Sequence, residues 1–288
     1  MLQCIKRHGL KILSSSGIRR KEIISKPTSF DKEKAAIPKL GCLTFRCNIC
    51  GQVSEGKMVE LTREEPSCTN CGSTVRMRSI VYLISTEFFG KSLALPDFPV
   101  RPDIVGMGMS DWEGYAIPLA HKLSYTNTYY HQQPQLDITR IDPKLENTLD
   151  FLISSDVFEH VAPPVSTAFE NAYRLLKPNG VFIFTVPYSK DGQTEEHFPE
   201  LYDYQIIKRD ERYILKNFTQ DGREQVFENL VFHGGAGLTV EMRIFSEAPL
   251  MEEFEQAGFT EAKIHKESDF EHGVFWHQDW SLPITARK

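Results

Sequence analysis

The pattern of apolar and polar residues is clearest between Leu149 and Tyr188. Residues 151–154 and 181–186 are continuous apolar runs, and a polar loop follows the first run. Between the runs, apolar residues recur at helical spacing over 168–176, which predicts an amphipathic helix. The sequence Lys-Pro-Asn-Gly at 177–180 predicts the turn that ends this helix. Strands that are apolar on both faces are typical of parallel sheets covered by helices, so the segment predicts an α/β unit.

Similar patterns precede this unit. Residues 103–111 predict an apolar strand that runs into a Gly-x-Gly turn, followed by a helix over 112–123. Apolar residues at steps of three and four predict an earlier helix over 75–88, with Arg76 and Arg78 on its opposite side. Pro96, Pro99 and Pro102 interrupt regular structure and indicate a boundary within 91–102.

The chain beyond Pro187 predicts a long insertion over 188–246, with hairpin signals at 208–211 and 220–222. A helix over 247–257 and two last strands over 259–266 and 282–287 complete the predicted elements. Insertions of this kind generally determine substrate specificity in α/β enzymes.

Composition describes an ordinary soluble protein of 288 residues, with 41% hydrophobic and 25% charged residues. No apolar run approaches the roughly 20 residues that a membrane span needs. The N-terminus has no apolar signal segment, so we expect a cytoplasmic protein. Ten Lys and Arg face three acids in residues 1–40, a local charge of +7 that leaves −13 on the other 248 residues. We expect residues 1–40 to form a flexible basic leader, and the acidic body argues against a nucleic-acid partner.

Four of the six cysteines form two pairs, Cys47-x2-Cys50 and Cys68-x2-Cys71, separated by 17 residues. This spacing is typical of a zinc ribbon, in which four thiolates enclose a structural Zn²⁺. Gly51 and Gly72 follow the second cysteine of each pair and permit the tight turn that such a site requires. Disulfides or a redox motif are the alternatives for these cysteines. The sequence therefore divides into a leader at 1–40, a zinc ribbon at 41–75, a helix and linker at 76–102, and a main domain at 103–288.

The segment from 149 to 188 resembles the class I S-adenosylmethionine-dependent methyltransferases, in particular the methyltransferase type 11-like proteins. The resemblance rests on the acidic and apolar strand at 150–154, the loop that ends in Glu159-His160, and the Leu-Lys-Pro-Asn-Gly turn at 176–180. It covers residues 103–288 and implies a Rossmann-like sheet of seven strands that binds S-adenosylmethionine. With its cysteine pairs, the whole chain looks like bacterial methyltransferases that carry an amino-terminal zinc ribbon.

The resemblance also implies where the cofactor would bind. The Gly106-Met107-Gly108 segment would approach it, and Asn127 would accept a hydrogen bond from the ribose, with His131 as second choice. Asn127 as a plain turn residue at a strand end is the alternative. The remaining contacts implied are Asp137 to the adenine amino group, Ile138 to the ring, and Ser155 and Asp156 alongside the cofactor. For Asp137 the alternative is an Asx-turn.

Three histidines are candidates for chemistry. His197 and His233, both in the insertion, are candidates for the base that removes a proton from the methyl acceptor, because a histidine titrates near neutral pH. Glu159 and His160 either act on the substrate or cap and orient the next helix. A metal site formed by Glu196, His197 and His233 is a further alternative, and so is a purely structural role for each histidine.

The sequence predicts a methyltransferase that acts on an oxygen of a small molecule or glycan, because the body is acidic and the insertion carries histidines. One alternative is an RNA or protein methyltransferase that holds its substrate with the zinc ribbon. The other is a non-catalytic module that binds the cofactor on a degenerate methyltransferase fold.

Overall fold

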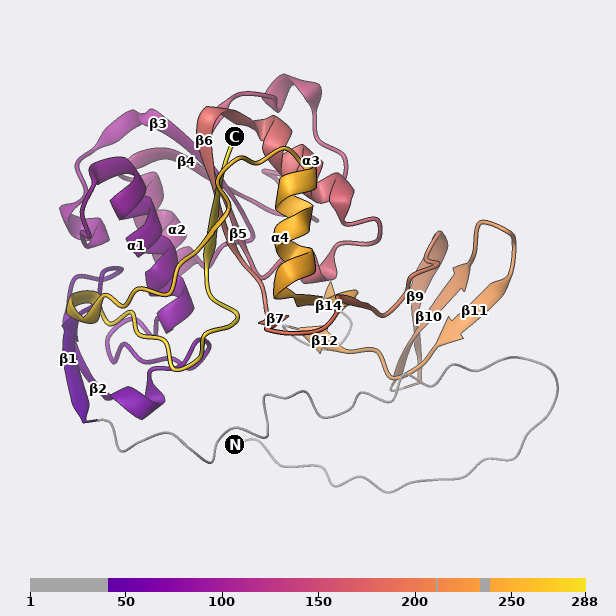
Figure 1. Ribbon diagram of the computed structural model, residues 1–288, viewed down its shortest axis with the longest axis horizontal. Coiled ribbons are helices and arrows are strands. Elements are labelled where there is room, and N and C mark those ends of the chain that lie inside the picture. Colours follow the sequence, from indigo (N-terminus) through magenta and orange to yellow (C-terminus); the bar gives the residue numbers. More distant parts are fainter. Residues whose placement is uncertain (1–40, 211, 234–238) are drawn as a thin grey trace.

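A central sheet of six strands organises the protein (Figure 1). The computed structural model describes residues 41–210, 212–233 and 239–288, so the predicted basic leader at 1–40 lies outside the described residues. The strand order is β15-β16-β6-β5-β3-β4. The four parallel strands are β3 (Arg101–Met109), β4 (Leu123–Thr128), β5 (Leu149–Ser155) and β6 (Leu176–Thr185). The antiparallel strands β16 (Ile284–Arg287) and β15 (Lys263–Ile264) extend the sheet beyond β6.

The prediction of seven strands is not confirmed, since the central sheet has six strands among the described residues. The segment after β4, where the additional strand was expected, forms only one parallel bridge, between Tyr129 and Gln135. Pro134 has no N–H with which to donate to a neighbouring strand. Leu136 and Ile138 are nevertheless buried in the core beside the sheet. The segment therefore packs where a strand would lie without continuing the ladder of hydrogen bonds.

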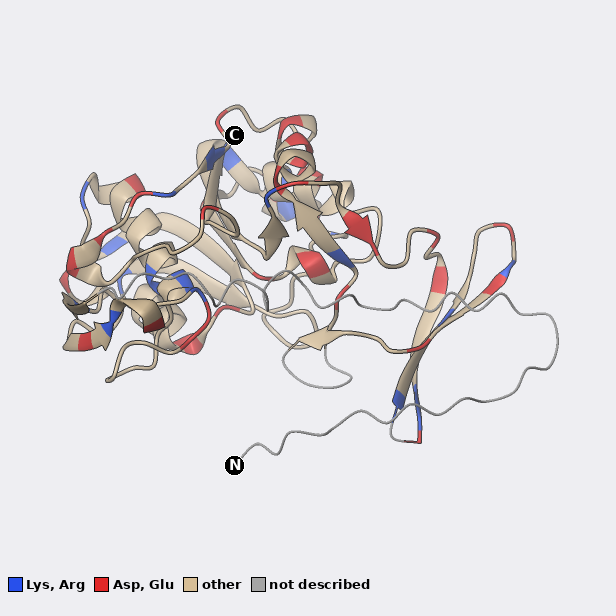
Figure 2. Ribbon diagram, turned by 60° about the horizontal axis from the view of Figure 1, so that its bottom comes forward, with Lys and Arg blue, Asp and Glu red and all other residues tan. Residues whose placement is uncertain are grey.

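Helices cover both faces of the sheet, as the apolar strands predicted (Figure 1). On one face, α1 (Val75–Phe89) and α2 (Glu113–Ala120) pack against side chains that include Phe151, Ile153 and Ile183. On the other face, α3 (Ser166–Leu175) and α4 (Glu247–Gln256) pack against Leu152, Phe182 and Phe184. Full burial of an apolar side chain of this size contributes roughly 1.5–3 kcal/mol to the free energy of folding. Glutamates, visible in Figure 2, give the exposed side of α4 its acidic character.

The predictions at two strand ends have different outcomes. Gly106 and Gly108 lie within β3, where both neighbouring strands pair with them, and the turn begins only at Ser110, which has φ of 57°. Residues 177–180, predicted as a turn, fall within the bounds of β6 but form an irregularity between Leu176 and Val181, which pair with β5. Asn179 there has φ of 66°, so the backbone does turn at this position.

The segment of residues 41–74, which we call the cysteine module, packs on α1. Its hairpin consists of β1 (Cys42–Arg46) and β2 (Val53–Lys57), followed by the short helix η2 (Met58–Glu60). Buried residues of the module, including Phe45 and Leu61, belong to the same hydrophobic cluster as α1 and the sheet. The module is thus part of the core on this face.

Arg78 of α1 fastens the module, and its predicted place on the outer side of the helix is wrong. The side chain is 0% exposed, and it donates to the carbonyls of Ser73 (2.7 Å) and Gly273 (2.9 and 3.0 Å) and to the Ser67 hydroxyl (2.8 Å). Its guanidinium also lies over the Phe45 ring. A buried arginine is tolerated here because these oxygens accept its donors.

The insertion forms separate small sheets beyond β6 (Figure 1). A three-stranded antiparallel sheet of β9 (Asp203–Arg209), β10 (Arg212–Phe218) and β11 (Glu224–Phe227) projects from the body and confirms both predicted hairpins. Short strands connect it to the body; they are β7 (Tyr188–Ser189), β8 (Glu195–Glu196), β12 (Phe232–His233), β13 (Thr239–Val240) and β14 (Arg243–Ser246). Short 3-10 helices occupy several loops; they are η3 (Leu95–Asp97), η4 (Pro143–Leu145), η5 (Phe158–His160) and η6 (Phe270–His272). None of the helices in the described ranges has the length and apolar composition needed to cross a bilayer.

Candidate functional site

The loops that follow β3, β4 and β5 meet at the carboxyl edge of the parallel strands, where open α/β folds bind ligands. Asn127, near the end of β4, links two of them. Its Oδ1 accepts from the Asp111 backbone N–H, and its Nδ2 donates to the Asp111 carbonyl, both at 2.9 Å. The amide therefore fixes the loop after β3, and its predicted role toward a ribose stays a prediction.

The space beside Gly108 is filled by protein side chains. A Cβ at this position would lie 2.0 Å from Asp111 Oδ2 and 2.1 Å from the Tyr125 hydroxyl. The Tyr125 hydroxyl donates to Asp111 Oδ2 at 2.5 Å, and burial raises the pKa of Asp111 to about 6. At Gly106, a Cβ would meet the Phe151 ring at 2.0 Å. These glycines make room for neighbouring side chains, and Met107 between them packs against the core on the opposite face.

Asp137 lies in the loop after β4 and forms the Asx-turn that was one alternative for it. Its Oδ1 accepts from the Thr139 backbone N–H at 2.9 Å and from the Thr139 hydroxyl at 2.7 Å. Ile138 beside it is 5% exposed. Asp137 itself is half-buried, so its carboxylate still reaches the surface at this edge.

Asp156, after β5, is paired with two arginines from the N-terminal part of the chain. Arg63 of the cysteine module donates to both carboxylate oxygens at 2.7 and 3.0 Å, and Arg76 of α1 lies 3.1 Å from Oδ2 and also bonds the Ser155 hydroxyl. Burial would raise the pKa of Asp156, but the charges of Arg63 and Arg76 outweigh it and hold that pKa below its usual range. The Thr185 hydroxyl, at the end of β6, donates to Oδ1 at 3.0 Å.

The three predicted catalytic histidines lie together around Glu241. His197 Nε2 lies 2.9 Å from Glu241 Oε1, and His233 Nε2 lies 3.0 Å from Oε2. The His160 ring packs edge-on against that of His233, with centroids 4.9 Å apart. Burial tends to raise the pKa of Glu241, but the hydrogen bonds from both histidines lower it to about 2. The same hydrogen bond raises the pKa of His233, whereas burial lowers that of His160.

The loop after β5 is joined to the insertion through the backbone of η5 and the ring of His160. The Glu159 carbonyl accepts from the Met242 N–H at 2.8 Å, and His160 Nδ1 lies 2.9 Å from the Val240 carbonyl. Arg243, fully buried, donates to the Phe158 carbonyl at 2.7 Å. These contacts hold η5 and the insertion in a fixed register.

Two interpretations of these acids are wrong. Glu159 and His160 do not cap α3, because no side chain caps its N-terminus and His160 bonds Val240 instead. Glu196 does not join His197 and His233 in a metal site, because Arg243 bonds both of its carboxylate oxygens. A second acid besides Glu241, Glu159, lies close to His160 and His233; it is 1% exposed, and neither of its carboxylate oxygens has a hydrogen-bond partner among the described residues.

A pocket of about 680 Å³ opens between this cluster and the start of the insertion. The residues that line it include Glu159, Glu241, Tyr188, Lys190 and Trp280. Acidic, cationic and aromatic groups therefore face one cavity of a size that holds a small molecule.

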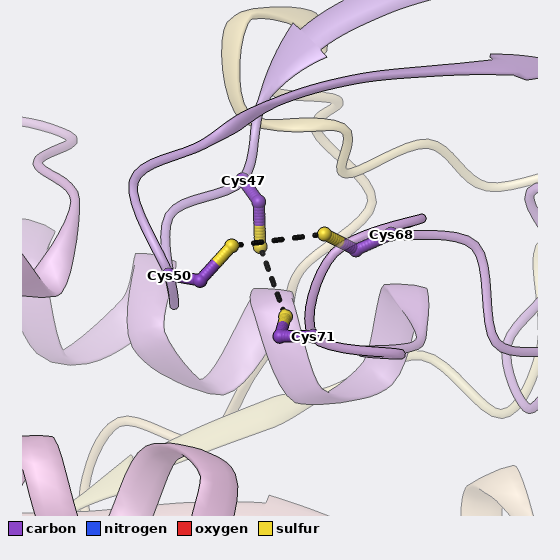
Figure 3. Close-up of side chains that lie close together, drawn as sticks. All are labelled: Cys47, Cys50, Cys68 and Cys71. Carbon is purple, nitrogen blue, oxygen red and sulfur yellow. Dashed lines mark hydrogen bonds between the residues drawn. The ribbon is translucent and has the colours of Figure 1, made fainter.

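The cysteines Cys47, Cys50, Cys68 and Cys71 converge at the base of the module (Figure 3). The Sγ–Sγ distances are 3.7 Å between Cys47 and Cys71 and 3.7 Å between Cys50 and Cys68. A tetrahedral zinc with Zn–S bonds of about 2.3 Å would place sulfurs about 3.8 Å apart. The thiols thus fit zinc, and the positive φ of Gly51 (74°) and Gly72 (73°) confirms the predicted tight turns.

Comparison with known proteins relates the sheet to methyltransferases. The family model described as "Methyltransferase domain" matches residues 111–184, from the loop after β3 through most of β6. This match supports a class I methyltransferase. No curated protein sequence matches the chain.

Several solved methyltransferase structures are similar to this chain at low identity. The 1,6-didemethyltoxoflavin-N1-methyltransferase of Burkholderia thailandensis is 15% identical, covering 74% of this chain and 77% of that one, with a TM-score of 0.39. CalS10, an amino pentose methyltransferase from Micromonospora echinaspora, is 12% identical, covering 75% and 92%, with a TM-score of 0.40. KedS8, a sugar N-methyltransferase from Streptoalloteichus, is 10% identical, covering 74% and 87%, with a TM-score of 0.41.

Sequence reasoning missed two residues of the site. No local sequence pattern marks Arg63 as a site residue, because its partner Asp156 lies 93 residues further along the chain. Arg76 was assigned to the outer side of its helix, although its side chain is only 14% exposed. Both arginines reach the site because the cysteine module packs on the sheet. The helical periodicity of the sequence contains no information about this packing.

Proposed function

We propose that this protein is an S-adenosylmethionine-dependent methyltransferase that methylates a hydroxyl oxygen of a small molecule or glycan. The observation that carries the proposal is the match of residues 111–184 to the methyltransferase domain, on strands whose loops gather polar groups at the ligand-binding edge. When bound, the cofactor supplies an electrophilic methyl group on a sulfonium.

The groups at this edge fit the cofactor chemically. Asp137 and Asn127 offer acceptors for amino and hydroxyl groups, and Ile138 offers apolar contact. Arg63 and Arg76, beside Ser155 and Asp156, are cations that would attract the cofactor carboxylate. The filled space beside Gly108 would keep the cofactor on the side of β4 and β5.

The acceptor would occupy the pocket beside Glu159 and Glu241. Methyl transfer forms a bond between the acceptor oxygen and the methyl carbon while the electron pair of the S–C bond returns to sulfur, so the protein must chiefly hold the acceptor in line. The hydroxyl proton would pass to the histidine cluster. Glu241 bonds Nε2 of both His197 and His233 and so orients both rings. Because His197 Nδ1 is buried, Nδ1 of the more exposed His233 is the nitrogen that would accept the proton.

We also infer a structural zinc on the four cysteines, since four thiolates leave no open position for a substrate. The cysteine module would then contribute to the site through Arg63, without taking part in the chemistry.

The experiment is methyl transfer from isotopically labelled S-adenosylmethionine to a panel of hydroxylated small molecules and oligosaccharides. We expect product with at least one acceptor, and loss of about 10²-fold or more in rate for His197→Ala combined with His233→Ala. His121→Ala, an exposed histidine outside the cluster, is the matched control and should leave the rate unchanged.

A second candidate, a non-catalytic module that binds the cofactor, is favoured by one observation. The glycine segment after the start of β3 is degenerate, because Asp111 and the Tyr125 hydroxyl fill the space beside Gly108. This candidate predicts cofactor binding without transfer to any acceptor in the panel.

A further inference from the structure

We propose that Glu159, His160 and His233 bind a divalent transition-metal cation at the wall of the insertion pocket. One ligand atom from each of the three residues lies within 4.8 Å of the others, which is the spread that a single ion can bridge. A carboxylate with two histidines is a ligand set that zinc and iron(II) favour in catalytic sites.

Glu159 is the residue that most requires a partner. It is 1% exposed, and neither carboxylate oxygen has a hydrogen-bond partner among the described residues. A buried polar group left unpaired costs free energy, and an ion is one of the ordinary explanations for such a group. His160 Nε2, at 3.8 Å from Glu159 Oε1, is too distant for a hydrogen bond but is placed to share a cation with it.

Both histidines are held in the way that metal ligands usually are. His160 Nδ1 bonds the Val240 carbonyl, so this nitrogen carries the proton and Nε2 keeps a free lone pair. His233 Nε2 bonds the Glu241 carboxylate, which leaves Nδ1 available. A carbonyl or carboxylate behind each imidazole fixes its tautomer and raises its basicity as a ligand.

The position of the cation would face the substrate. Of the three ligands, Glu159 lines the 680 Å³ pocket, and a site with three protein ligands leaves coordination positions open for a substrate. A cation there would bind the acceptor hydroxyl and lower its pKa, so that the proton leaves more readily to water in the open pocket. With Nδ1 bound to the cation, His233 would act as a metal ligand in place of its role as the base. This catalytic role rests on the proposed function, whereas the metal site itself does not.

The test must distinguish metal bound by the four cysteines from metal bound by Glu159, His160 and His233. The full-length protein, purified with its thiolate site loaded with zinc, would be dialysed against a mild chelator and titrated with Co²⁺. Cobalt bound to thiolates gives sulfur-to-metal charge-transfer bands in the near ultraviolet, and cobalt bound to nitrogen and oxygen does not. We expect one added equivalent of cobalt per chain without charge-transfer bands, on top of one retained zinc counted by mass spectrometry.

Glu159→Gln, His160→Gln and His233→Gln should each weaken this cobalt binding by about tenfold or more, and His131→Gln should leave it unchanged. The retained zinc shows that each variant is folded around its cysteines. The proposal is overturned if the wild-type protein binds no added cobalt, or if any of the three variants binds it with the wild-type affinity. Cofactor binding is measured separately by calorimetry, so cobalt binding without cofactor binding would leave the metal site standing and reject the proposed function.

Discussion

Arg63 and Asp156 form a two-pronged ion pair, with Nη2–Oδ1 and Nη1–Oδ2 distances of 2.7 and 3.0 Å, across 93 residues of sequence. The pair joins the cysteine module to the loop after β5. It connects the part of the chain that would hold zinc to the edge of the sheet that would hold the cofactor. The cysteine module therefore contributes directly to the candidate site.

Replacement of Arg63 by alanine should destabilise the protein. The side chains of Arg63 and Asp156 are 12% and 19% exposed, so the variant leaves a largely buried carboxylate with Arg76 as its remaining cation. We expect a loss of about 2–4 kcal/mol in the free energy of unfolding, measured with denaturant. Arg101→Ala, which removes a fully exposed pair with Asp103, should cost much less, because solvent screens such pairs. Equal losses in the two variants would contradict this interpretation of the Arg63 pair.

The free energy of unfolding should decrease as the pH rises from 4 to 7, because of Asp111. Its pKa is raised to about 6 in the folded state, so the folded protein keeps this proton where the unfolded chain loses it. The stabilisation is complete below about pH 4 and is lost as the pH rises through about 6, a change of about 2–3 kcal/mol. Asp111→Asn should reduce this slope in unfolding measured across the pH range, and Asp203→Asn, at an exposed position, should keep it unchanged. The remaining slope comes from Glu159 and His233, whose pKa values are also raised in the folded protein. A slope in Asp111→Asn as steep as in the wild type would contradict the assignment to Asp111.

A methyl group at Gly108 should disturb the site as well as the core. In Gly108→Ala the new Cβ would collide with Asp111 and the Tyr125 hydroxyl, both buried, and force them apart. Thermal or chemical unfolding should show a loss of about 1–3 kcal/mol. Gly41→Ala is the control, since nothing lies within 4 Å of its Cβ position. Wild-type stability in Gly108→Ala would show that Asp111 and Tyr125 are not packed over this strand.

Removal of the metal from the cysteines should weaken the whole domain. Cys47 and Cys68 belong to the same hydrophobic cluster as Phe151 and Ile183 of the sheet, so unfolding of the module exposes that face. Cys68→Ser should lower the melting temperature seen by circular dichroism and release zinc, because binding of such a metal is coupled to folding. Cys42→Ser, at an exposed cysteine outside the four, should do neither.

The sequence predicted those parts of the fold that depend on local pattern. The apolar runs at 151–154 and 181–186 became β5 and β6, and the helix over 75–88 became α1. The cysteine spacing predicted the convergence of four thiols, because two turns of known geometry fix it. The missing strand beside β4 was not predictable in this way, since a strand exists only if its neighbour accepts its hydrogen bonds.

The sequence identified several residues of the candidate site but not the contacts that each of them makes. The three histidines are together, as a shared catalytic role would require, but the acid between His197 and His233 is Glu241. Arg78 has the helical position of an exposed residue and is buried, because carbonyls from Ser73 and Gly273 surround it. Such partners are distant in sequence, so periodicity gives no information about them.

The central claim is that the chain binds S-adenosylmethionine at the carboxyl edge of β3, β4 and β5. Isothermal titration calorimetry of the full-length protein with S-adenosylmethionine tests it most directly, with Asp137→Asn and the exposed-site control Asp203→Asn measured alongside. We expect saturable binding of one cofactor per chain, weakened by about tenfold in Asp137→Asn and unchanged in Asp203→Asn. The absence of saturable binding to the folded wild-type protein would contradict the claim.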